Sequence, residues 1–506
     1  MLSDAIDISR ISKIVGYKID KGDFGPQNSN LPQRIGVFAE ANTANQGTLD
    51  TTPTVITSAQ QAGNLYGYGS PMHIISRILF PVNGGGIGSI PVVAYPQEAA
   101  VGSVAKVMTV TPVGTATKNG VHTVKVAGRG GIDGDSYEIS IASGDTGAVI
   151  AGKIMDALNN VLACPFIATE NSYETILTAK WTGLTSNDLT ISVDTGADAL
   201  GITYTVSNHT SGSGTPTSGV TSSLALIQSD WVTQVINSYG PVTAVLSAFE
   251  AFNGIANATT PTGRFVGIVM KPFVAITGDV SDNASAITDA RLNEMTIAIA
   301  PAPLSAGLPM EAAANMAVLS ARTCQDTPHL DVSGQVYPDM PTPTSIGTMN
   351  DYANRDAYVK KGCSTVELNA GVYKICDFVT TYHPVGETPP QFRYVRNIML
   401  DMNIRYGYYL LEQINVVDHA IADDNTTVSV IKVVKPKGWK QVLSGYADDL
   451  GARGLIVDVP FMKASLTTGI SSVNPDRFET TFSYKRSGFA RQSATTAKAG
   501  FNFGTL

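Results

Sequence analysis

The chain has few charged residues, few cysteines and no long apolar run. Only 15% of its 506 residues are charged, against about 25% in an average soluble protein. The four cysteines (Cys164, Cys324, Cys363 and Cys376) form no CxxC pair, which favours reduced, buried thiols over a disulfide framework or a zinc site. No segment reaches the ~18 unbroken apolar residues of a membrane helix. With 43% apolar residues, the chain is expected to fold into several globular domains.

The charge balance argues against two classes of partner. A formal net charge of −8 creates no positive field that would attract nucleic acid or an anionic membrane. Residues 1–10 hold two aspartates and lack the basic start and apolar stretch of a signal peptide. We therefore expect cytosolic synthesis and folding, no nucleic acid partner and no direct membrane insertion.

The usual sequence signatures of catalytic and cofactor sites are missing. The six histidines form no HExxH motif, and no GxSxG elbow occurs. The glycine-rich stretch 83–89 lies between a helix pattern and a strand pattern without GK[ST], so it predicts a tight connection and not a phosphate loop. The acidic pairs Asp133/Asp135 and Asp423/Asp424 are interpreted as solvated turns, with calcium binding as the minor alternative. We predict no catalytic residue, no cofactor and no metal.

The hydrophobic pattern changes along the chain. A buried strand is predicted over 34–40, and Ser58 and Ser70 are predicted to cap two short helices. From residue 101 the pattern alternates with period two, which indicates antiparallel β structure, and one helix carries a stripe of Ile150, Ile154 and Leu158. After this insert, helix and strand patterns alternate again, which predicts a mostly parallel or mixed sheet covered by helices.

These patterns predict an α/β (α+β) multidomain chain. Its segments are an N-terminal arm (1–24), the first part of an α/β domain (25–100), an inserted β-rich domain (101–212), the second part of the α/β domain (213–390), a C-terminal α/β domain (391–494) and a C-terminal arm (495–506). Local patterns also predict a helix over 229–240, strands over 264–270, 426–434 and 454–462, a hairpin at 369–371, a long helix over 391–414, and a flexible linker within the uncharged stretch 199–229.

The sequence patterns at both ends of the chain predict extended segments that need a sheet to join. Val15, Tyr17 and Ile19 alternate on one face, and a lone strand is not stable. Such a strand must join a sheet in its own chain or, by β-augmentation, in a neighbouring subunit. The last residues end in GFNFG and predict a second extended arm. The candidate inter-subunit contacts are Ile14, Val15, Tyr17, Ile19, Phe501 and Phe503.

The low overall charge hides an uneven distribution. Residues 101–220 contain six basic and ten acidic side chains. Residues 480–506 contain no acidic residue and four basic ones: Lys485, Arg486, Arg491 and Lys498. We therefore predict an acidic insert and a basic C-terminal arm, with much of the remaining neutral surface directed at other copies of the chain.

Ordered motifs along the chain carry a family resemblance. They are PQRIGVFAEANTANQGT, AQQAGNLYGYGSPMHIISRILF and VVAYP near the start, GDTGAVIAGKIMDALNN, CPFIATE and LTAKWTGLTSND in the insert, then VYKICDFVTTYH, INVVDH and FETTFSYKRSGFA. In this order they resemble contractile-tail sheath proteins over nearly the whole chain. Each motif is short and non-catalytic, so the specificity lies in their order.

The resemblance implies a non-enzymatic structural subunit of a contractile tail, most simply that of a tailed bacteriophage. Such subunits stack as six-membered rings around an inner tail tube and contract to drive the tube through the host envelope for genome ejection. The implied partners are copies of the chain, the inner tube protein, and baseplate and tail terminator proteins. The implied location is the virion tail, assembled in the host bacterial cytoplasm.

The resemblance also implies an orientation, with the insert outermost and the C-terminal domain facing the tube. Four lysines, Lys432, Lys435, Lys437 and Lys440, are then possible contacts to acidic tube residues through salt-sensitive interactions. A solvated basic turn is the alternative. For the whole chain, the alternatives are the sheath of a phage-tail-like bacteriocin or secretion system, a surface adhesin, which would need the export signal that is missing here, and a hydrolase assembled from distant residues.

Overall fold

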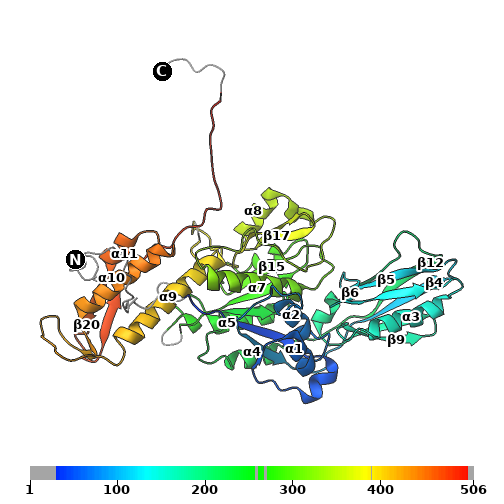
Figure 1. The fold of residues 1–506 in the computed structure, drawn as a ribbon, viewed down its shortest axis with the longest axis horizontal. Helices are drawn as coiled ribbons and strands as arrows, with labels where there is room; N and C mark the ends of the chain where they lie inside the picture. The colour runs from blue at the N-terminus through cyan, green and yellow to red at the C-terminus, as the bar shows by residue number, and fades with distance from the viewer. Residues whose placement is uncertain (1–29, 257–259, 267–269, 389, 500–506) are drawn as a thin grey trace, which may run out of the picture.

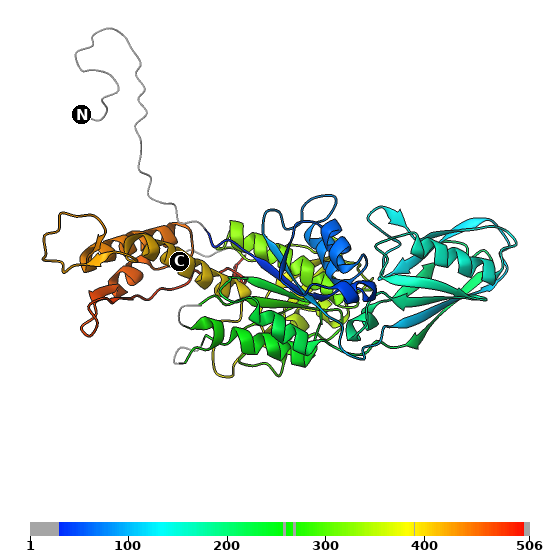
Figure 2. The same cartoon turned by 90° about the horizontal axis from the view of Figure 1, so that it is seen from below.

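A computed structural model describes residues 30–256, 260–266, 270–388 and 390–499. Figure 1 shows three bodies in a row: a central sheet covered by helices, a β-rich unit at one end and a helical unit at the other. Figure 2 shows the same elongated arrangement from below. The predicted multidomain α/β architecture is confirmed.

The central body is built on a six-stranded sheet with the order β15-β14-β13-β1-β3-β2. Its strands are β1 (Ile35–Glu40), β2 (Thr54–Ile56), β3 (Val92–Gln97), β13 (Gln234–Asn237), β14 (Val274–Asp279) and β15 (Ile297–Pro301). All neighbours are parallel except β2 and β3. Every residue of the five parallel strands is buried, as expected of a sheet covered on both faces. The predicted strand over 34–40 and the mostly parallel sheet are confirmed.

Helices cover both faces of this sheet. On one face lie α1 (Ala59–Tyr66), α2 (Pro71–Leu79) and α7 (Pro309–Asp326), and their buried side chains share one core with β1 residues such as Val37. On the other face lie α4 (Thr217–Ala225) and α5 (Thr243–Asn253), which pack with Phe38. The two predicted caps are confirmed, because Ser58 accepts a hydrogen bond from the Gln61 amide and Ser70 accepts one from the His73 amide. Smaller elements are η1 (Thr43–Thr48), η3 (Gly263–Phe265), α6 (Ser285–Thr288), η4 (Gly347–Asn350), α8 (Tyr352–Lys360) and the predicted hairpin, β16 (Thr365–Asn369) with β17 (Val372–Asp377).

The β-rich unit is inserted between β3 and β13. It contains the antiparallel sheets β12-β4-β10-β9 and β11-β5-β8, with the helix α3 (Gly147–Asn159) packed against them. The strands are β4 (Val107–Gly114), β5 (Gly120–Val126), β8 (Glu138–Ile141), β9 (Phe166–Asn171), β10 (Glu174–Ala179), β11 (Ile191–Asp194) and β12 (Ile202–Thr210), with a small hairpin of β6 (Gly131–Ile132) and β7 (Asp135–Ser136), and the 3-10 helix η2 (Leu184–Asp188). The predicted stripe of Ile150, Ile154 and Leu158 is fully buried. The antiparallel β structure is therefore confirmed.

The third body is organised by two long helices. It holds α9 (Val395–Asn415), α10 (Pro436–Ala452), α11 (Val459–Ser465), the hairpin β20 (Thr467–Ile470) and β21 (Phe478–Thr481), and the two-residue strands β18 (Ala420–Ile421) and β19 (Val433–Val434). Tyr446 of α10 donates a hydrogen bond to the Ile404 carbonyl of α9, 2.6 Å away. Gly407 lies under this ring, where a Cβ atom would be 2.6 Å from the tyrosine oxygen. The long helix predicted over 391–414 is confirmed.

Two sequence predictions fail inside the central sheet. The helix expected over 229–240 is instead the central strand β13, whose four residues are all buried. A short apolar run does not distinguish a buried strand from a buried helix, and tertiary packing decides this one. The strand expected over 264–270 is also wrong, because residues 263–265 form a 3-10 turn and the sheet strand comes later, at β14; residues 267–269 lie outside the described part.

Three further predictions fail near the boundaries of the bodies. The flexible linker expected within 199–229 is replaced by strand β12, paired with β4, and by helix α4. Most β12 side chains are exposed, so this strand can form from polar uncharged residues. Its composition therefore resembles that of a flexible linker. The strand expected over 454–462 gives way to helix α11, which Asp458 caps by accepting from the Phe461 amide. Of the strand expected over 426–434, only β19 forms.

Candidate assembly surfaces

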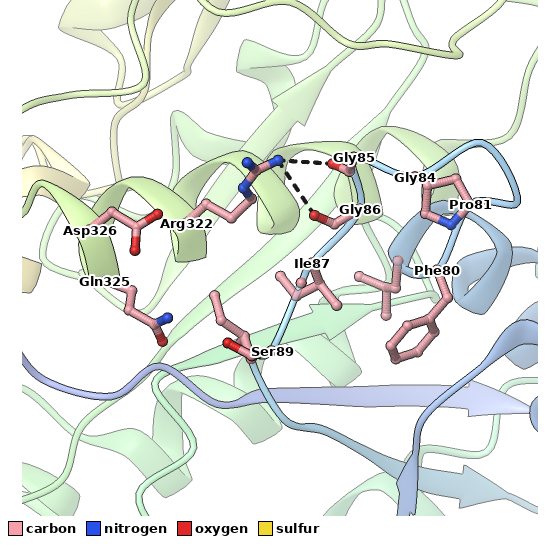
Figure 3. Close-up of a pocket in the computed structure, with 13 residues that line it drawn as sticks. Phe80, Pro81, Gly84, Gly85, Gly86, Ile87, Ser89, Arg322, Gln325 and Asp326 are labelled. Atoms are coloured by element: carbon pink, nitrogen blue, oxygen red, sulfur yellow. Dashed lines mark hydrogen bonds between the residues drawn. The ribbon is translucent and has the colours of Figure 1, made fainter.

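The glycine-rich stretch 83–89 is a connection between α2 and β3. Figure 3 shows it beside α7, where Arg322 donates a 2.9 Å hydrogen bond to the Gly85 carbonyl. A phosphate loop instead directs backbone N–H groups at its ligand from the start of a helix, and here a strand follows. The prediction of a tight connection is confirmed.

The described residues contain no group of three or more His, Cys, Asp and Glu side chains placed to hold a metal ion. The four cysteines are free thiols, and all but the half-buried Cys376 are buried. Burial raises the pKa of Cys324 to about 12 and also raises that of Cys363, so neither is a thiolate at neutral pH. In the described part of the chain, no helix is both long and apolar enough to cross a membrane.

The six predicted arm contacts, Ile14, Val15, Tyr17, Ile19, Phe501 and Phe503, lie outside the described residues. The structure does describe the point at which each arm joins the body. We call these points the N-terminal root (residues 30–34) and the C-terminal root (residues 485–491).

The N-terminal root is held where the central body meets the helical unit. The amide of Leu31 donates to Asn403 Oδ1 of α9, 2.8 Å away, and Asn30 Nδ2 donates to the Gln325 carbonyl of α7 at 2.7 Å. Arg453, just after α10, donates to Asn30 Oδ1. Contacts from α7, from α9 and from Arg453 just after α10 therefore hold residues 30 and 31 in place.

The C-terminal root is fixed mainly by ion pairs. Arg486 contacts both carboxylate oxygens of Asp401 in α9. Arg491 pairs with Asp331, whose side chain is only 2% exposed, and with Asp377 at 3.3 Å, while its guanidinium lies 3.8 Å from the Tyr394 ring centre. Residues 492–499 are exposed, and Figure 1 shows the chain leaving the body there.

These pairs correct the prediction of a basic C-terminal arm. Lys485 pairs with Asp458, and Arg486 and Arg491 pair as described above. Of the four basic residues after position 480, only Lys498 has no ion-pair partner among the described residues. The charge excess is largely neutralised inside the chain, because its acidic partners lie far away in the sequence.

The four candidate lysines surround the N-terminus of α10. Lys435 is the N-cap residue and donates to the Thr426 carbonyl, Lys437 and Lys440 follow in the first turns, and Lys432 precedes them. Except for the half-buried Lys435, these lysines are exposed, and none of the four has an ion-pair partner within the part of the chain that the structure describes. The structure therefore brings together the lysines that the sequence grouped.

Helix electrostatics oppose this arrangement. The N-terminus of a helix carries partial positive charge, so cations there are unfavourable by about 0.3–1 kcal/mol each. No acidic residue lies in the first turn of α10, although Asp424 Oδ1 accepts from the Lys437 amide at 2.8 Å. The lysines thus do not serve the stability of their own helix.

Sequence reasoning missed two features of this surface. Asp424, interpreted as a solvated turn residue, accepts a hydrogen bond from the first turn of α10. A capping residue normally lies directly before its helix, whereas Asp424 lies 13 residues before Lys437, in the loop between β18 and β19. The sequence therefore gave no signal of this cap. Val430 and Ile431 are 69% and 89% exposed beside the lysines. Together with the lysines they form what we call the basic-apolar face.

The hairpin β20–β21 is a second candidate surface. The two strands pair only with each other among the described residues. An unpaired strand edge presents backbone N–H and C=O groups that can bind an added strand. The hairpin therefore has the geometry of an acceptor for an extended segment.

Comparisons with known proteins give a consistent result. No family model matches the chain. The chain is 23% identical over 432 residues to the Mu-like prophage FluMu tail sheath protein of Haemophilus influenzae, a match covering 83% of this chain and 84% of that protein. The resemblance to tail sheath proteins drawn from the ordered motifs is confirmed by this relative.

Solved structures of sheath proteins also align with the chain. They are the sheath tail proteins of Desulfitobacterium hafniense (TM-score 0.46, 14% identity, 93% of this chain and 100% of that one) and Listeria innocua (0.46, 11%, 91% and 93%), and the contracted helical sheath of the anti-feeding prophage (0.47, 13%, 97% and 99%). At such TM-scores, the fold assignment rests on the architecture described above and not on superposition.

Proposed function

We propose that the chain is the structural, non-enzymatic subunit of a contractile phage tail sheath. It assembles as stacked six-membered rings around an inner tail tube, in a virion tail built in the host cytoplasm, and contracts to drive the tube through the host envelope for genome ejection. The observation that carries this proposal is the match to a tail sheath protein over 83% of the chain. The baseplate and tail terminator proteins are the partners at its two ends.

The arms connect the subunits in this proposal. Arm residues Ile14, Val15, Tyr17 and Ile19 on one side, and Phe501 and Phe503 on the other, add strands to sheets of neighbouring subunits. Two observations support it: the C-terminal root directs residues 492–499 away from the body, and the hairpin β20–β21 leaves strand edges unpaired in the described part. Arms fixed at their roots keep neighbours connected while the bodies rotate between two packings.

The C-terminal domain (391–494) faces the tube, and the insert (101–212) lies outermost. The basic-apolar face supports this orientation, since unpaired lysines held against their helix dipole suit an acidic partner surface. Contraction consumes no nucleotide, so its energy is the free-energy difference between the two subunit packings.

Negative-stain electron microscopy of the expressed protein tests the assembly directly. We expect tubes of stacked rings. A monomeric protein under all assembly conditions would contradict the proposal. Co-expression with neighbouring tail genes then separates a phage sheath from the alternative, the sheath of a phage-tail-like bacteriocin or secretion system.

Deletion of residues 1–22 tests the N-terminal arm. The deletion ends eight residues before the described N-terminal root, so we expect the subunit to fold with unchanged thermal unfolding but to form no long sheaths. Full-length contractile sheaths from the truncated protein would show that the arm returns to its own chain.

A further inference from the structure

A cavity of about 580 Å³ lies beside the N-terminal root, at the amino end of the central sheet. Its size falls in the range of about 300–1,000 Å³ that is typical of ligand pockets. Its walls come from the root, from the segments that lead into β3, β13 and β14, and from α7 and α9. The cavity therefore lies where the central body meets the helical unit.

Aromatic side chains form much of the cavity wall. They are Trp231, Tyr406 and Tyr409. Tyr409 is 42% exposed, and the other two are half-buried. The Trp231 indole N–H donates to the Pro272 carbonyl at 3.0 Å, and the Arg405 guanidinium lies 5.8 Å from the centre of the Trp231 ring. These contacts hold the indole in place, so the cavity offers aromatic surface in a fixed arrangement to another side chain.

Every charged side chain among the described residues that line the cavity is basic. These side chains are Arg34, Lys271 and Arg405. Arg34 pairs with Asp230 at 2.8 Å, whereas Lys271 and Arg405 have no ion-pair partner in the described part of the chain. A complementary occupant therefore combines an aromatic ring with a negative charge.

The chain itself contains such a combination outside the described residues. The aromatic residues there are Tyr17, Phe24, Phe501 and Phe503. Phe24 directly follows Asp23, whereas Tyr17 directly precedes Lys18, which the basic lining would repel. Residues 500–506 contain no acidic side chain. Charge complementarity therefore selects Phe24 among these four residues.

Phe24 is also tethered close to the cavity. It precedes Leu31 by seven residues, and Leu31 and Pro32 are part of the cavity wall. Seven residues span at most about 25 Å, and the Gly25-Pro26 pair between them favours a turn. A flexible tether this short gives an effective concentration in the millimolar range. A side chain on this tether therefore has the advantage over the same side chain on a second copy.

We propose that Phe24 docks in this cavity of its own chain, with the Asp23 carboxylate beside the unpaired cations of Lys271 and Arg405. The contact anchors the N-terminal arm to the body at the junction between the central sheet and α9. This docking does not depend on the proposed sheath function.

The anchor shortens the free part of the arm. Ile19, the last of the predicted N-terminal arm contacts, lies eleven residues before Asn30 but only five before Phe24. Eleven residues span at most about 40 Å and five at most about 18 Å. In an assembly, a docked Phe24 would therefore restrict the arm to neighbouring subunits close to this cavity.

Tryptophan fluorescence of the isolated full-length chain tests the docking. The chain has three tryptophans, and Trp181 and Trp439 are 0% and 2% exposed, so quenching by acrylamide reports on Trp231. Phe24→Ala should abolish the protection of Trp231 from acrylamide, because the ring that covers the cavity is gone. The substitution Trp231→Phe confirms the origin of the signal.

Two deletions form a matched pair. Deletion of residues 1–22 retains Phe24 and should leave the protection of Trp231 as in the full chain. Deletion of residues 1–26 removes Phe24 and should abolish the protection. Both deletions end before the described N-terminal root, so thermal unfolding of the two proteins should be the same within about 0.5 kcal/mol.

The charge contact has its own test. Added salt screens the attraction between Asp23 and the two cations, so the protection of Trp231 should weaken with salt in the wild-type chain. Asp23→Asn should lower the protection and remove its salt dependence. An equal salt dependence in both proteins would refute the pairing of Asp23.

Three outcomes would overturn the docking of Phe24. The first is unchanged quenching in Phe24→Ala or after deletion of residues 1–26. The second is protection that disappears on dilution, which would assign the cavity to a second copy of the chain. The third is protection that is kept in Phe24→Ala but lost in the double variant Phe501→Ala, Phe503→Ala, which would assign the cavity to the C-terminal arm.

Discussion

Two groups of basic residues in the last 75 residues look alike in the sequence but differ in the structure. At the C-terminal root, Arg486 and Arg491 reach acidic partners in α9 and around Asp331. On the basic-apolar face, Lys437 and Lys440 reach none among the described residues. Positive charge in a sequence therefore marks either an internal connection or a surface for another molecule, and only distant acidic partners distinguish the two.

The largest effect should come from breaking the C-terminal root. Arg491→Ala leaves Asp331 buried, with a side chain 2% exposed and without its ion-pair partner, a change that costs about 3 kcal/mol. Thermal unfolding should shift down, and limited proteolysis should begin earlier after residue 487. Lys498→Ala, which removes an unpaired charge, should change stability by less than about 0.5 kcal/mol. If Arg491→Ala and Lys498→Ala lowered the stability equally, the paired and the unpaired charge would not differ as the structure indicates.

A substitution of intermediate effect tests the contact between α9 and α10. Helix α9 holds Asp401, the partner of Arg486 in the C-terminal root, and α10 begins among the candidate lysines. Gly407→Ala places a methyl group against Tyr446, and such overpacking costs about 1–3 kcal/mol. Helix propensity alone predicts the opposite sign, a gain of up to about 1 kcal/mol. Gly445→Ala in α10, where nothing lies within 4 Å of the added atom, should show that gain. Chemical denaturation of both variants measures whether each substitution raises or lowers the free energy of unfolding.

The smallest change in stability should come from the lysines. Lys437→Glu replaces a cation by an anion in the first turn of α10, so we expect the isolated subunit to gain about 0.3–1 kcal/mol. Reversal at all four lysines should nevertheless weaken assembly on the tube, in a salt-dependent way, more than it weakens sheath self-assembly. Lys360→Glu in α8, a lysine that pairs with Asp356 in its own helix and lies far from α10 in the sequence, is the charge-reversal control. Equal losses in the two assembly measurements would argue against tube contact.

The sequence predicted elements well where one signal dominated. Ser58 and Ser70 precede helices as caps, the apolar run at 34–40 is a buried strand, and the stripe of Ile150, Ile154 and Leu158 faces a core. It failed where local signals were ambiguous. The run containing β13 has the composition of either a strand or a buried helix, and the uncharged stretch of β12 resembles a linker because its side chains need not be buried.

The candidate surfaces divide in the same way. The sequence located the lysine group and the excess of positive charge after residue 480. It did not identify the partners of Arg486 and Arg491, since Asp401 and Asp331 lie 85 and 160 residues away.

By itself, the sequence determined the α/β class of the chain, its inserted β-rich segment and its likeness to tail sheath proteins, because periodicity, caps and motif order are local properties. Tertiary structure alone decided which charges are paired and where each arm leaves the body. Those properties depend on contacts between residues far apart in the chain, and the free energy of burial or pairing exists only once these residues meet.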